Sequence, residues 1–363
     1  MSTRSFRIAL LIVGGSLLVL LSIGAFMVHR ALGYPDEPRA GQGVEVKVEI
    51  KRGMSFPQIA RLLADKQVIV RPRWFRLYAM YRGVTTEVKT GDYLLRDDMT
   101  PAQVLDTILE GVADVTVSVT IPEGLNMLEA LDLVVKSGAV PNRVELIAAA
   151  RDPRFLQRMG ISGGSVEGYL FPETYRFKVP SKPEEVLRRM IEQHRVVWDR
   201  VQRAHGKELA ELRDRLDWSD REILIMASIV EKEAVVDTER PRIAQVFLNR
   251  LTSPSFKPKK LETDPTIRYG CMVPAQKSEG CAKWDPTQRL RRAQLDDVDN
   301  LYNTYQHEGL PPGPICSPGE RSLVATVNPD GSDYFYFVAK DDRTHVFSRN
   351  VAEHNRNVAK YMK

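Results

Sequence analysis

The sequence predicts an α+β protein with a single N-terminal transmembrane helix, a small βα subdomain and a larger α+β domain. Three observations support this prediction. An uncharged apolar run lies near the N-terminus, a strand–glycine turn–helix pattern occurs twice, and the second half alternates long helical patterns with short aromatic strands. The predicted boundaries are 1–7, 8–28, 29–43, 44–117, 118–160 and 161–363.

Composition excludes several classes of protein. The chain has 363 residues, with Lys+Arg 52 against Asp+Glu 47 and a formal net charge of +5. Because these charges are spread along the chain, they do not form a nucleic-acid footprint, and no nucleic-acid partner is expected. Three cysteines without a CxxC pair or an HExxH motif favour neither a disulfide framework nor a zinc site. We therefore expect no structural zinc site.

The apolar run covers residues 8–28 and contains no charge. As a helix it would extend ~32 Å, about the hydrocarbon thickness of a bilayer. Arg4 and Arg7 precede it, which predicts that residues 1–7 lie in the cytoplasm and that the rest is exported. The expected location is a single-pass protein of the cytoplasmic (inner) membrane, with the larger domain in the periplasm or outside the cell.

A cleaved signal peptide is the alternative reading of this segment. Ala31-Leu32-Gly33 would supply the small-residue cleavage site. Signal h-regions usually span ~7–15 residues, so the longer run favours a retained anchor. Residues 29–43, rich in Pro and Gly, are then expected to be a linker.

The small subdomain begins with a period-two pattern at residues 44–50, followed by Gly53 and by Ser55 as a helix N-cap. A helix at about 73–81, a strand at 92–95 and a helix at about 101–109 follow. The pattern Val48-Glu-Ile50-x-x-Gly53-x-Ser55 returns later as Val119-Thr-Ile121-x-x-Gly124-x-Asn126. The first copy, within 44–117, resembles LysM carbohydrate-binding modules, which pair two helices with a small sheet. The second copy, within 118–160, is read as a further βα unit and connector.

The larger domain is predicted over 161–363. Helices are expected at about 183–205, at 220–233 and around Ile243–Leu251, and strands at 334–338 and 346–347. An irregular stretch between them, 254–318, is rich in Pro, Gly, Thr and Asn. Stretches of this length in a compact domain are more often functional than idle.

Glu231 is the principal catalytic candidate. It follows an apolar run on the helix at 220–233, on the same face as Leu224, Ala227 and Ser228. A carboxyl group against apolar surface loses hydration, which favours its protonated form and suits a general acid. A glutamate at a helix end that simply reaches water is the alternative. Glu233, two positions further along the helix, points to nearly the opposite side and cannot converge on the same cleft.

Other polar clusters combine amides, hydroxyls and aromatic rings, which suit the hydroxyls and apolar faces of sugars. Ordinary turn architecture would explain the same residues. The substrate-binding candidates are Glu167, Tyr169, Glu173, Thr174, Ser228, Asn249, Arg250, Thr263, Asp264, Thr266, Tyr269, Asn303, Thr304 and Tyr305.

Seven blocks in order resemble the YceG-like family of endolytic murein transglycosylases. They include Val166-Glu-Gly-Tyr-Leu-Phe-Pro-Glu-Thr-Tyr175, Ala227-Ser-Ile-Val-Glu-Lys-Glu-Ala234, Val246-Phe-Leu-Asn-Arg-Leu251, Leu261-Glu-Thr-Asp-Pro-Thr-Ile-Arg-Tyr269, Tyr302-Asn-Thr-Tyr-Gln306, Gly309-Leu-Pro-Pro-Gly-Pro-Ile315 and Tyr334-Phe-Tyr-Phe-Val338 with His345-Val-Phe347. The similarity covers about residues 45–363.

The resemblance implies cleavage within peptidoglycan glycan strands between MurNAc and GlcNAc, leaving a 1,6-anhydroMurNAc end. It also places the catalytic glutamate at Glu231 and implies no metal and no cofactor. Because the sugar's own C6 hydroxyl attacks C1, one glutamate can act as acid and then as base. Peptidoglycan strands, the membrane through 8–28 and cell-wall synthases of the elongation machinery are the implied partners.

The loop between Tyr269 and Trp284 contains Cys271 and Cys281. Many relatives have a shorter loop here without paired cysteines. In an exported chain, Cys271 and Cys281 are expected to form a disulfide and Cys316 to stay free. Two rival functions are a non-catalytic peptidoglycan-binding adaptor, which needs no acid at Glu231, and an amidase or peptidase, which needs zinc ligands or a nucleophile with a base.

Overall fold

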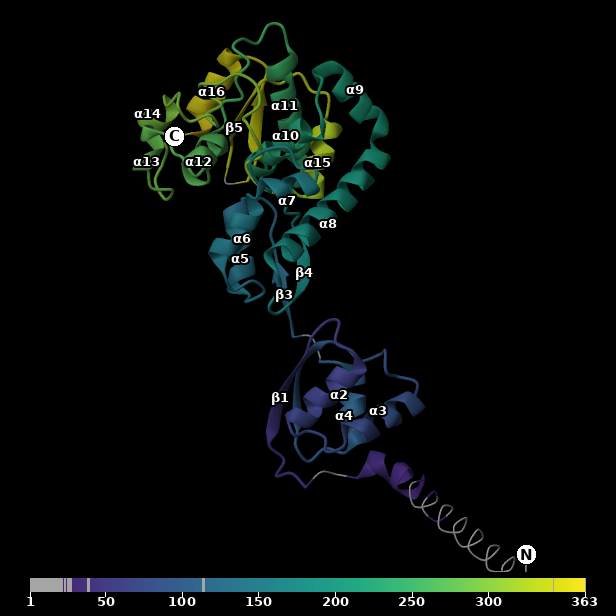
Figure 1. Ribbon diagram of the computed structural model, residues 1–363. Coiled ribbons are helices and arrows are strands. Elements are labelled where there is room, and N and C mark those ends of the chain that lie inside the picture. Colours follow the sequence, from purple (N-terminus) through teal and green to yellow (C-terminus); the bar gives the residue numbers. More distant parts are fainter. Residues whose placement is uncertain are drawn as a thin grey trace, which may run out of the picture. The chain divides into compact units, whose positions relative to one another are not determined.

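The computed structural model describes Ser22, Gly24 and residues 28–37, 40–112, 115–341 and 343–362. The chain divides into two compact units, one ending at Asp114 and the other beginning at Val115 (Figure 1). No helix within the described ranges is long and apolar enough to cross a membrane. The predicted anchor at 8–28 lies almost wholly outside these ranges, so it stays a prediction.

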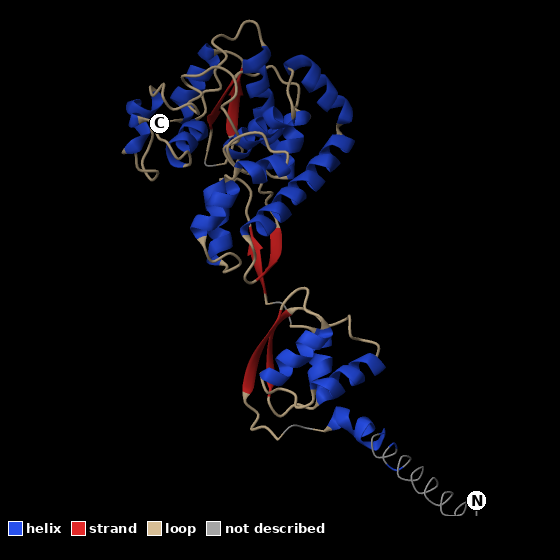
Figure 2. Ribbon diagram, in the orientation of Figure 1, coloured by secondary structure: helices blue, strands red, loops and turns tan. Residues whose placement is uncertain are grey.

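The first unit packs helices against one face of a two-stranded antiparallel sheet (Figure 2). In the register of this sheet Val48 lies opposite Tyr93, and both side chains enter the core. Two helices connect the strands in sequence, which is the content expected of the LysM-like subdomain, although the LysM assignment itself stays a prediction. The elements are η1 (Tyr34–Asp36), β1 (Glu45–Ile50), α2 (Phe56–Asp65), α3 (Pro72–Tyr81), β2 (Gly91–Arg96) and α4 (Pro101–Glu110).

Part of the expected linker at 29–43 is folded onto this unit. Residues 28–33 are helical and continue into η1, and the Tyr34 side chain is 4% exposed within the core. Its hydroxyl donates to the carbonyl of Arg71 at 3.2 Å. Residues 29–36 therefore do not form the predicted linker, because the Tyr34 side chain packs in the core of this unit.

The second unit begins with the repeat of the strand–turn–helix pattern. β3 (Thr116–Thr120) leads through Gly124, at φ +78°, to α5 (Met127–Lys136). Asn126 and Glu129 form a capping box at the N-terminus of α5. The first copy has the same order, with Gly53 at φ +87° and a capping box of Ser55 and Gln58. The repeated local pattern is thus confirmed, and glycine is required because both turns use the left-handed region.

The two copies differ in what they pair with. β3 forms an antiparallel pair with β4 (Thr174–Lys178), with Val119 opposite Tyr175, and their side chains share a core with α8 (Pro183–Ala204). Residues 118–160 therefore belong to the same compact unit as the following domain. The contacts divide the chain at 114/115, whereas the sequence suggested boundaries at 117/118 and 160/161.

α10 (Asp220–Glu233) is the central helix of the second unit. Every residue from Ile223 to Val230 is buried, and the helix packs against α11 (Arg240–Thr252), α12 (Asp264–Met272) and α15 (Glu320–Val327). The remaining elements are α6 (Arg143–Ala150), α7 (Pro153–Arg158), α9 (Gly206–Leu216), η2 (Asp237–Glu239), α13 (Glu279–Ala282), α14 (Arg292–Leu295), β5 (Tyr336–Ala339), β6 (His345–Ser348) and α16 (Val351–Tyr361). The stretch 254–318, expected to be irregular, contains α12, α13 and α14.

Candidate active site

Glu231 lies where α10 leaves the core. The helix begins at a capping box formed by Ser219 and Glu222, and its apolar run fixes the register that brings Glu231 to the last turn. The Glu231 side chain is 6% exposed. The sequence pattern had placed this carboxyl at the edge of the buried stripe, and the structure agrees.

Three donors converge on one oxygen of Glu231. The backbone N–H of Gly319 donates to Oε2 at 3.0 Å, the hydroxyl of Ser322 at 2.8 Å, and a guanidinium nitrogen of Arg240 lies at 3.1 Å. In the described part of the chain no hydrogen bond reaches Oε1. Oε2 thus holds the carboxyl in place, and Oε1 is the oxygen that can carry and transfer a proton.

Hydrogen-bond donors surround the Glu231 carboxyl group, where the sequence predicted apolar surroundings. Arg240 is itself buried, with a side chain 8% exposed, and it also binds Asp237 at 3.0 Å and the hydroxyl of Ser322 at 2.5 Å. Asp237 also pairs with Arg321. A buried ion pair of this kind is costly to break from one side only, so the network fixes the geometry of the site.

A loop from the start of the second unit covers the end of α10. The N–H of Gly124 donates to the carbonyl of Ser317 at 3.0 Å, and the N–H of Ser317 donates to the carbonyl of Leu125 at 2.9 Å. The ammonium group of Lys232 donates to the carbonyl of Gly124 at 3.1 Å. A Cβ on Gly124 would lie 3.6 Å from Cγ of Glu231, so the loop backbone passes directly over the glutamate.

This loop brings a second carboxyl group, Glu123, to the site. A Cβ on Gly319 would overlap Oε1 of Glu123, and Gly319 is also a donor to Glu231. Loss of hydration and the charge of Glu231 raise the pKa of Glu123, while Arg240 and Arg321 oppose that shift. The two carboxyl groups therefore face the same short stretch of backbone.

Sequence reasoning missed Glu123. At the matching position of the first copy of the repeat the residue is Arg52, so a charge reversal in the turn was the available signal. Arg240 and Ser322 gave no comparable signal, because they approach Glu231 from other helices.

Glu233 points to a different part of the unit. It is half-buried and accepts a hydrogen bond from the hydroxyl of Thr263, just before α12. Burial raises its pKa, and the nearby charge of Asp264 acts in the same direction. The separation of Glu231 and Glu233 expected from helix geometry is confirmed.

Glu167, a substrate-binding candidate from the sequence, is buried and bound within the fold. Both of its oxygens accept the N–H of Met127 at 3.0 Å, and Oε2 also accepts the hydroxyl of Tyr269 at 3.0 Å. Burial raises the pKa of Glu167 to about 7. These contacts tie α5 to α12 and leave the carboxyl without an exposed face for a sugar.

The threonine and asparagine candidates also have partners inside the fold. Thr266 and Thr304 share a hydrogen bond of 2.9 Å, and the hydroxyl of Thr304 accepts the N–H of Thr263 at 3.1 Å. The amide nitrogen of Asn303 donates to three backbone carbonyls between 2.9 and 3.1 Å. Their burial shows that they satisfy loop backbone, as buried polar groups must.

Two candidates on α11 hold the segment that leads into β5. Asn249 donates to the carbonyls of Ser332 and Tyr334 at 2.8 Å each, and Arg250 donates to those of Phe335 at 2.7 Å and Leu261 at 2.6 Å. Both side chains are thus committed to positioning the C-terminal strands.

Ser228 holds the chain that approaches Glu231. Its hydroxyl donates to the carbonyl of Ile225 at 2.7 Å and accepts the N–H of Ile315 at 3.0 Å. Its carbonyl oxygen accepts the thiol of Cys316 at 3.3 Å. Through this pairing Ser228 sets the path of the segment that reaches Gly319.

The remaining candidates lie apart from Glu231. Tyr169 contacts His194 edge to face at 5.3 Å, and Tyr305 donates to Asp264 at 2.9 Å. The Thr174 hydroxyl bonds across the β3–β4 pair to Thr120 at 2.9 Å. Glu173, directly before β4, is exposed. None of these side chains contacts the Glu231 carboxyl in the described residues.

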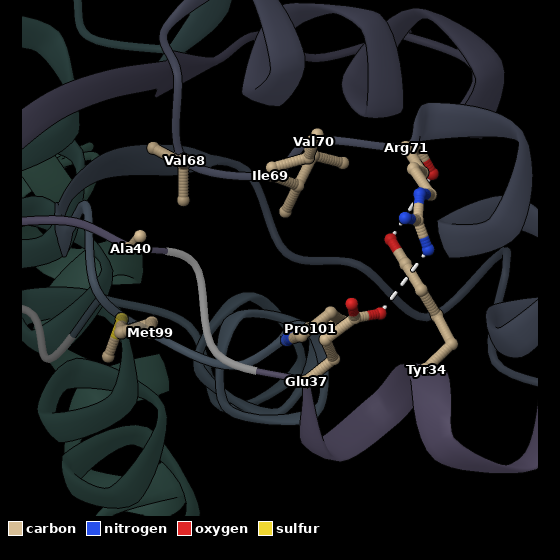
Figure 3. Close-up of a pocket in the computed structure, with 9 residues that line it drawn as sticks. All are labelled: Tyr34, Glu37, Ala40, Val68, Ile69, Val70, Arg71, Met99 and Pro101. Carbon is tan, nitrogen blue, oxygen red and sulfur yellow. Dashed lines mark hydrogen bonds and ion pairs between the residues drawn. The ribbon is translucent and has the colours of Figure 1, made fainter. Parts of the chain in front are cut away.

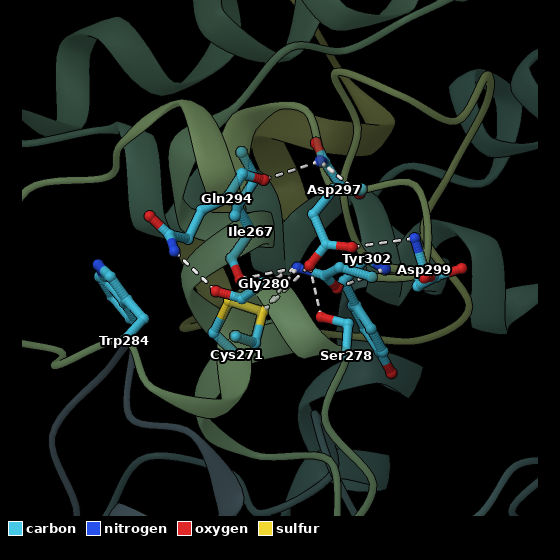
Figure 4. The surroundings of a disulfide bond; sticks show 12 residues. Ile267, Cys271, Ser278, Gly280, Trp284, Gln294, Asp297, Asp299 and Tyr302 are labelled. Atoms are coloured by element: carbon cyan, nitrogen blue, oxygen red, sulfur yellow. Dashed lines mark hydrogen bonds between the residues drawn. A yellow bond between two sulfur atoms is a disulfide. The ribbon is translucent and has the colours of Figure 1, made fainter.

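A disulfide joins Cys271 in α12 to Cys281 in α13, which is the pairing expected from the sequence, and Cys316 is free and buried (Figure 4). The amide nitrogen of Asn300 lies 3.8 and 3.7 Å from the two sulfurs. The described ranges contain no group of three His, Cys, Asp or Glu side chains arranged to hold a metal ion.

Comparison with known proteins identifies the family. The model of the YceG-like family matches residues 48–360. The chain belongs to the YceG-like family. An endolytic murein transglycosylase of Bacillus subtilis (strain 168) is 28% identical over 354 residues, covering 93% of this chain and 90% of the relative. An endolytic murein transglycosylase of Streptococcus pneumoniae serotype 2 is 28% identical over 349 residues, covering 87% of this chain and 58% of the relative.

A solved structure supports the same assignment. The crystal structure of a yceG-like protein from Listeria monocytogenes is 30% identical, with a TM-score of 0.54, and covers 87% of this chain and 99% of that one. This YceG-like chain therefore shares both its sequence family and its α+β fold with that protein.

Proposed function

We propose that this YceG-like protein is an endolytic murein transglycosylase that cleaves the β-1,4 bond between MurNAc and GlcNAc within peptidoglycan strands. The observation that carries the proposal is Glu231, a glutamate in the family's catalytic motif with one oxygen tied by three donors and the other free of hydrogen bonds in the described structure. The names of the curated relatives support the substrate and the type of reaction.

Glu231 supplies both proton transfers in this reaction. Its protonated Oε1 donates to the glycosidic oxygen as the bond between that oxygen and C1 breaks. The C6 hydroxyl oxygen of the same MurNAc then bonds to C1, and its proton passes to the Glu231 carboxylate. The product carries a 1,6-anhydroMurNAc end, no water is consumed, and Glu231 regains its proton.

Glu123 is the second carboxyl of the site in this proposal. Loss of hydration and the charge of Glu231 raise the pKa of Glu123, so Glu123 holds its proton more tightly when Glu231 is ionised. In this proposal an ionised Glu123 would favour the positive charge that develops at C1 in an oxocarbenium-like transition state.

The membrane topology and the partners are inferred from the sequence. Residues 8–28 anchor the protein in the cytoplasmic membrane with residues 1–7 inside, and the unit that begins at Val115 acts on the outer side. Cutting nascent strands there would end their elongation, which makes cell-wall synthases of the elongation machinery the expected partners.

The experiment is digestion of purified glycan strands by the full-length protein in detergent, followed by mass spectrometry of the products. Internal cleavage with 1,6-anhydroMurNAc ends is the expected result. Reducing MurNAc ends would instead identify a hydrolase. Binding without any cleavage would identify the non-catalytic adaptor, and released stem peptides would identify an amidase or peptidase.

A further inference from the structure

We infer that the exposed face of α3, together with the segment at residues 31–35, is a second membrane contact that lays the first unit on an anionic lipid surface. We call these residues the α3 face: Leu32, Arg73, Arg76, Leu77, Met80 and Tyr81. The inference rests on the proposed anchor at 8–28, but it concerns a different part of the chain and a different measurement.

The segment after the anchor is bound to the unit rather than free. Tyr34 packs on Trp74 with a ring-centroid separation of 6.2 Å and donates to the carbonyl of Arg71. The Arg71 guanidinium pairs with Glu37 at 3.3 Å (Figure 3). Arg30 pairs with the same carboxylate at 3.7 Å. Because these contacts fix residues 30–37 to the unit, the position of the anchor determines which side of the unit meets the bilayer.

That side is the α3 face. Ala31, Leu32 and Pro35 line a pocket of about 350 Å³ together with Trp74, Leu77, Tyr78 and Tyr81 of α3. The predicted anchor ends at Val28, so Leu32 is four residues further, about 6 Å along a helix. That distance places Leu32, and the α3 side chains around it, at the depth of the lipid headgroups.

The exposed stripe of α3 has the composition of an interfacial helix. Its inward side chains are Phe75 and Ala79, whereas residues 73, 76, 77, 80 and 81 share the opposite face and are exposed. Leu77 is 58% exposed and Tyr81 is 89% exposed. Large apolar side chains and an aromatic ring interleaved with arginine are typical of helices that lie in the membrane interface.

Charge favours an anionic surface as the partner. From Lys66 to Arg82 the sequence has five basic residues and no acidic one. Arg82 pairs with Asp106 and Arg71 with Glu37, but no ion pair is found for Arg73 or Arg76 in the described structure. Anionic phospholipid headgroups would attract both of these charges, and together with the apolar side chains of the α3 face this favours a lipid surface as the partner.

The test places one fluorescent label at a time on the full-length protein reconstituted in vesicles. The natural cysteines are disulfide-bonded or buried, so a cysteine introduced in Tyr81→Cys would take an environment-sensitive dye selectively. Leu94→Cys is the matched control, because Leu94 is exposed on the sheet face opposite Tyr93 and Leu95, which enter the core. Vesicles of phosphatidylglycerol and phosphatidylcholine carry a nitroxide quencher in the upper acyl chain.

The label at position 81 should shift to the blue and lose fluorescence to the lipid quencher, while the label at position 94 should do neither. The double substitution Arg73→Glu and Arg76→Glu should weaken the quenching at position 81 in anionic vesicles. Loss of each arginine should lower the equilibrium constant of the membrane contact about fivefold at low salt. Lys47→Glu, whose position pairs with Leu94 across the sheet, is the charge control and should leave the quenching unchanged.

Equal quenching at positions 81 and 94 would overturn the inference. So would failure of the full-length chain to integrate into the vesicles, or protection of the position-81 label by glycan strands in place of lipid. Strand cleavage by the same vesicles is measured in parallel, so loss of the membrane contact with intact cleavage, or the reverse, separates this inference from the proposed function.

Discussion

Glu231→Gln separates catalysis from folding because the structure assigns different tasks to the two carboxyl oxygens. Glutamine keeps an acceptor for Gly319 and Ser322, so the covering loop should stay in place. It cannot donate a carboxyl proton or accept one. Positioned acid–base catalysis is worth ~10²–10⁴-fold, and a site with one transferring group should lose at least that much.

The same substitution has a stability cost that follows from the contacts. Leaving a buried charge without its partner costs ~3–5 kcal/mol. Arg240 would keep Asp237 at 3.0 Å and Ser322 at 2.5 Å, so we expect a smaller loss, about 1–3 kcal/mol. Thermal unfolding followed by circular dichroism measures this loss, and activity is compared at a temperature where both proteins are folded.

Glu233→Gln is the matched control, because it makes the same chemical change two residues further on the same helix. Its carboxyl meets Thr263 and not the Glu231 network, so the rate of anhydromuropeptide release should change by less than about tenfold. Near-normal turnover by Glu231→Gln would refute the assignment. Loss of activity only in Glu233→Gln would place the chemistry on the other face of α10.

Substitutions at four further sites test the remaining contacts. Glu123→Gln should remove the limb of the pH dependence of kcat/KM that the raised pKa of the Glu123 carboxyl contributes, and Glu123→Asp, which keeps the carboxyl group, should restore it. An unchanged limb in Glu123→Gln would show that Glu123 is only structural. Gly319→Ala should lower kcat by up to about 10²-fold, because the new Cβ would overlap the Glu123 carboxyl; unchanged kcat would contradict this contact. The free energy of unfolding should fall by about 3 kcal/mol between pH 4.5 and 7, since buried Glu167 has a pKa of about 7 and the folded state binds more protons in that range. Glu167→Gln should remove this contribution, and urea unfolding of both proteins at pH 5 and pH 8 measures the difference; an equal fall in the variant would contradict it. Replacing Cys271 and Cys281 by serine should cost roughly 2–3 kcal/mol, measured by urea unfolding, and no loss would show that the disulfide does not stabilise the unit.

Local signals in the sequence were sufficient to place the helix that carries Glu231. The capping box of Ser219 and Glu222 fixes the start of α10, and the apolar run up to Val230 fixes which side chain first leaves the core. Both signals act within a few residues, where helix geometry determines the outcome. The predicted bounds 220–233 therefore match the structure, and the different directions of Glu231 and Glu233 followed from the same geometry.

The role of the polar loop residues could not be read from their type alone. Thr266, Thr304 and Asn303 have the hydroxyl and amide groups that bind sugars, but the same groups satisfy the backbone of a buried loop. Which task they serve depends on burial, and the burial of a stretch without regular periodicity is set by contacts over long sequence distances. The structure shows that these three side chains serve the loop.

The carboxyl group of Glu231 is positioned by segments that are distant in sequence. Gly319 and Ser322 lie 88 and 91 residues from Glu231, and the turn that carries Glu123 and Gly124 lies 108 residues before Lys232, its contact. No periodicity links such positions. The turn belongs to the strand β3, which pairs with β4, so the repeat at 118–160 contributes to the active site itself. The compact unit that begins at Val115 therefore contains the whole Glu231 network, whereas a chain starting at residue 161 would lack the second carboxyl group and the partner strand of β4.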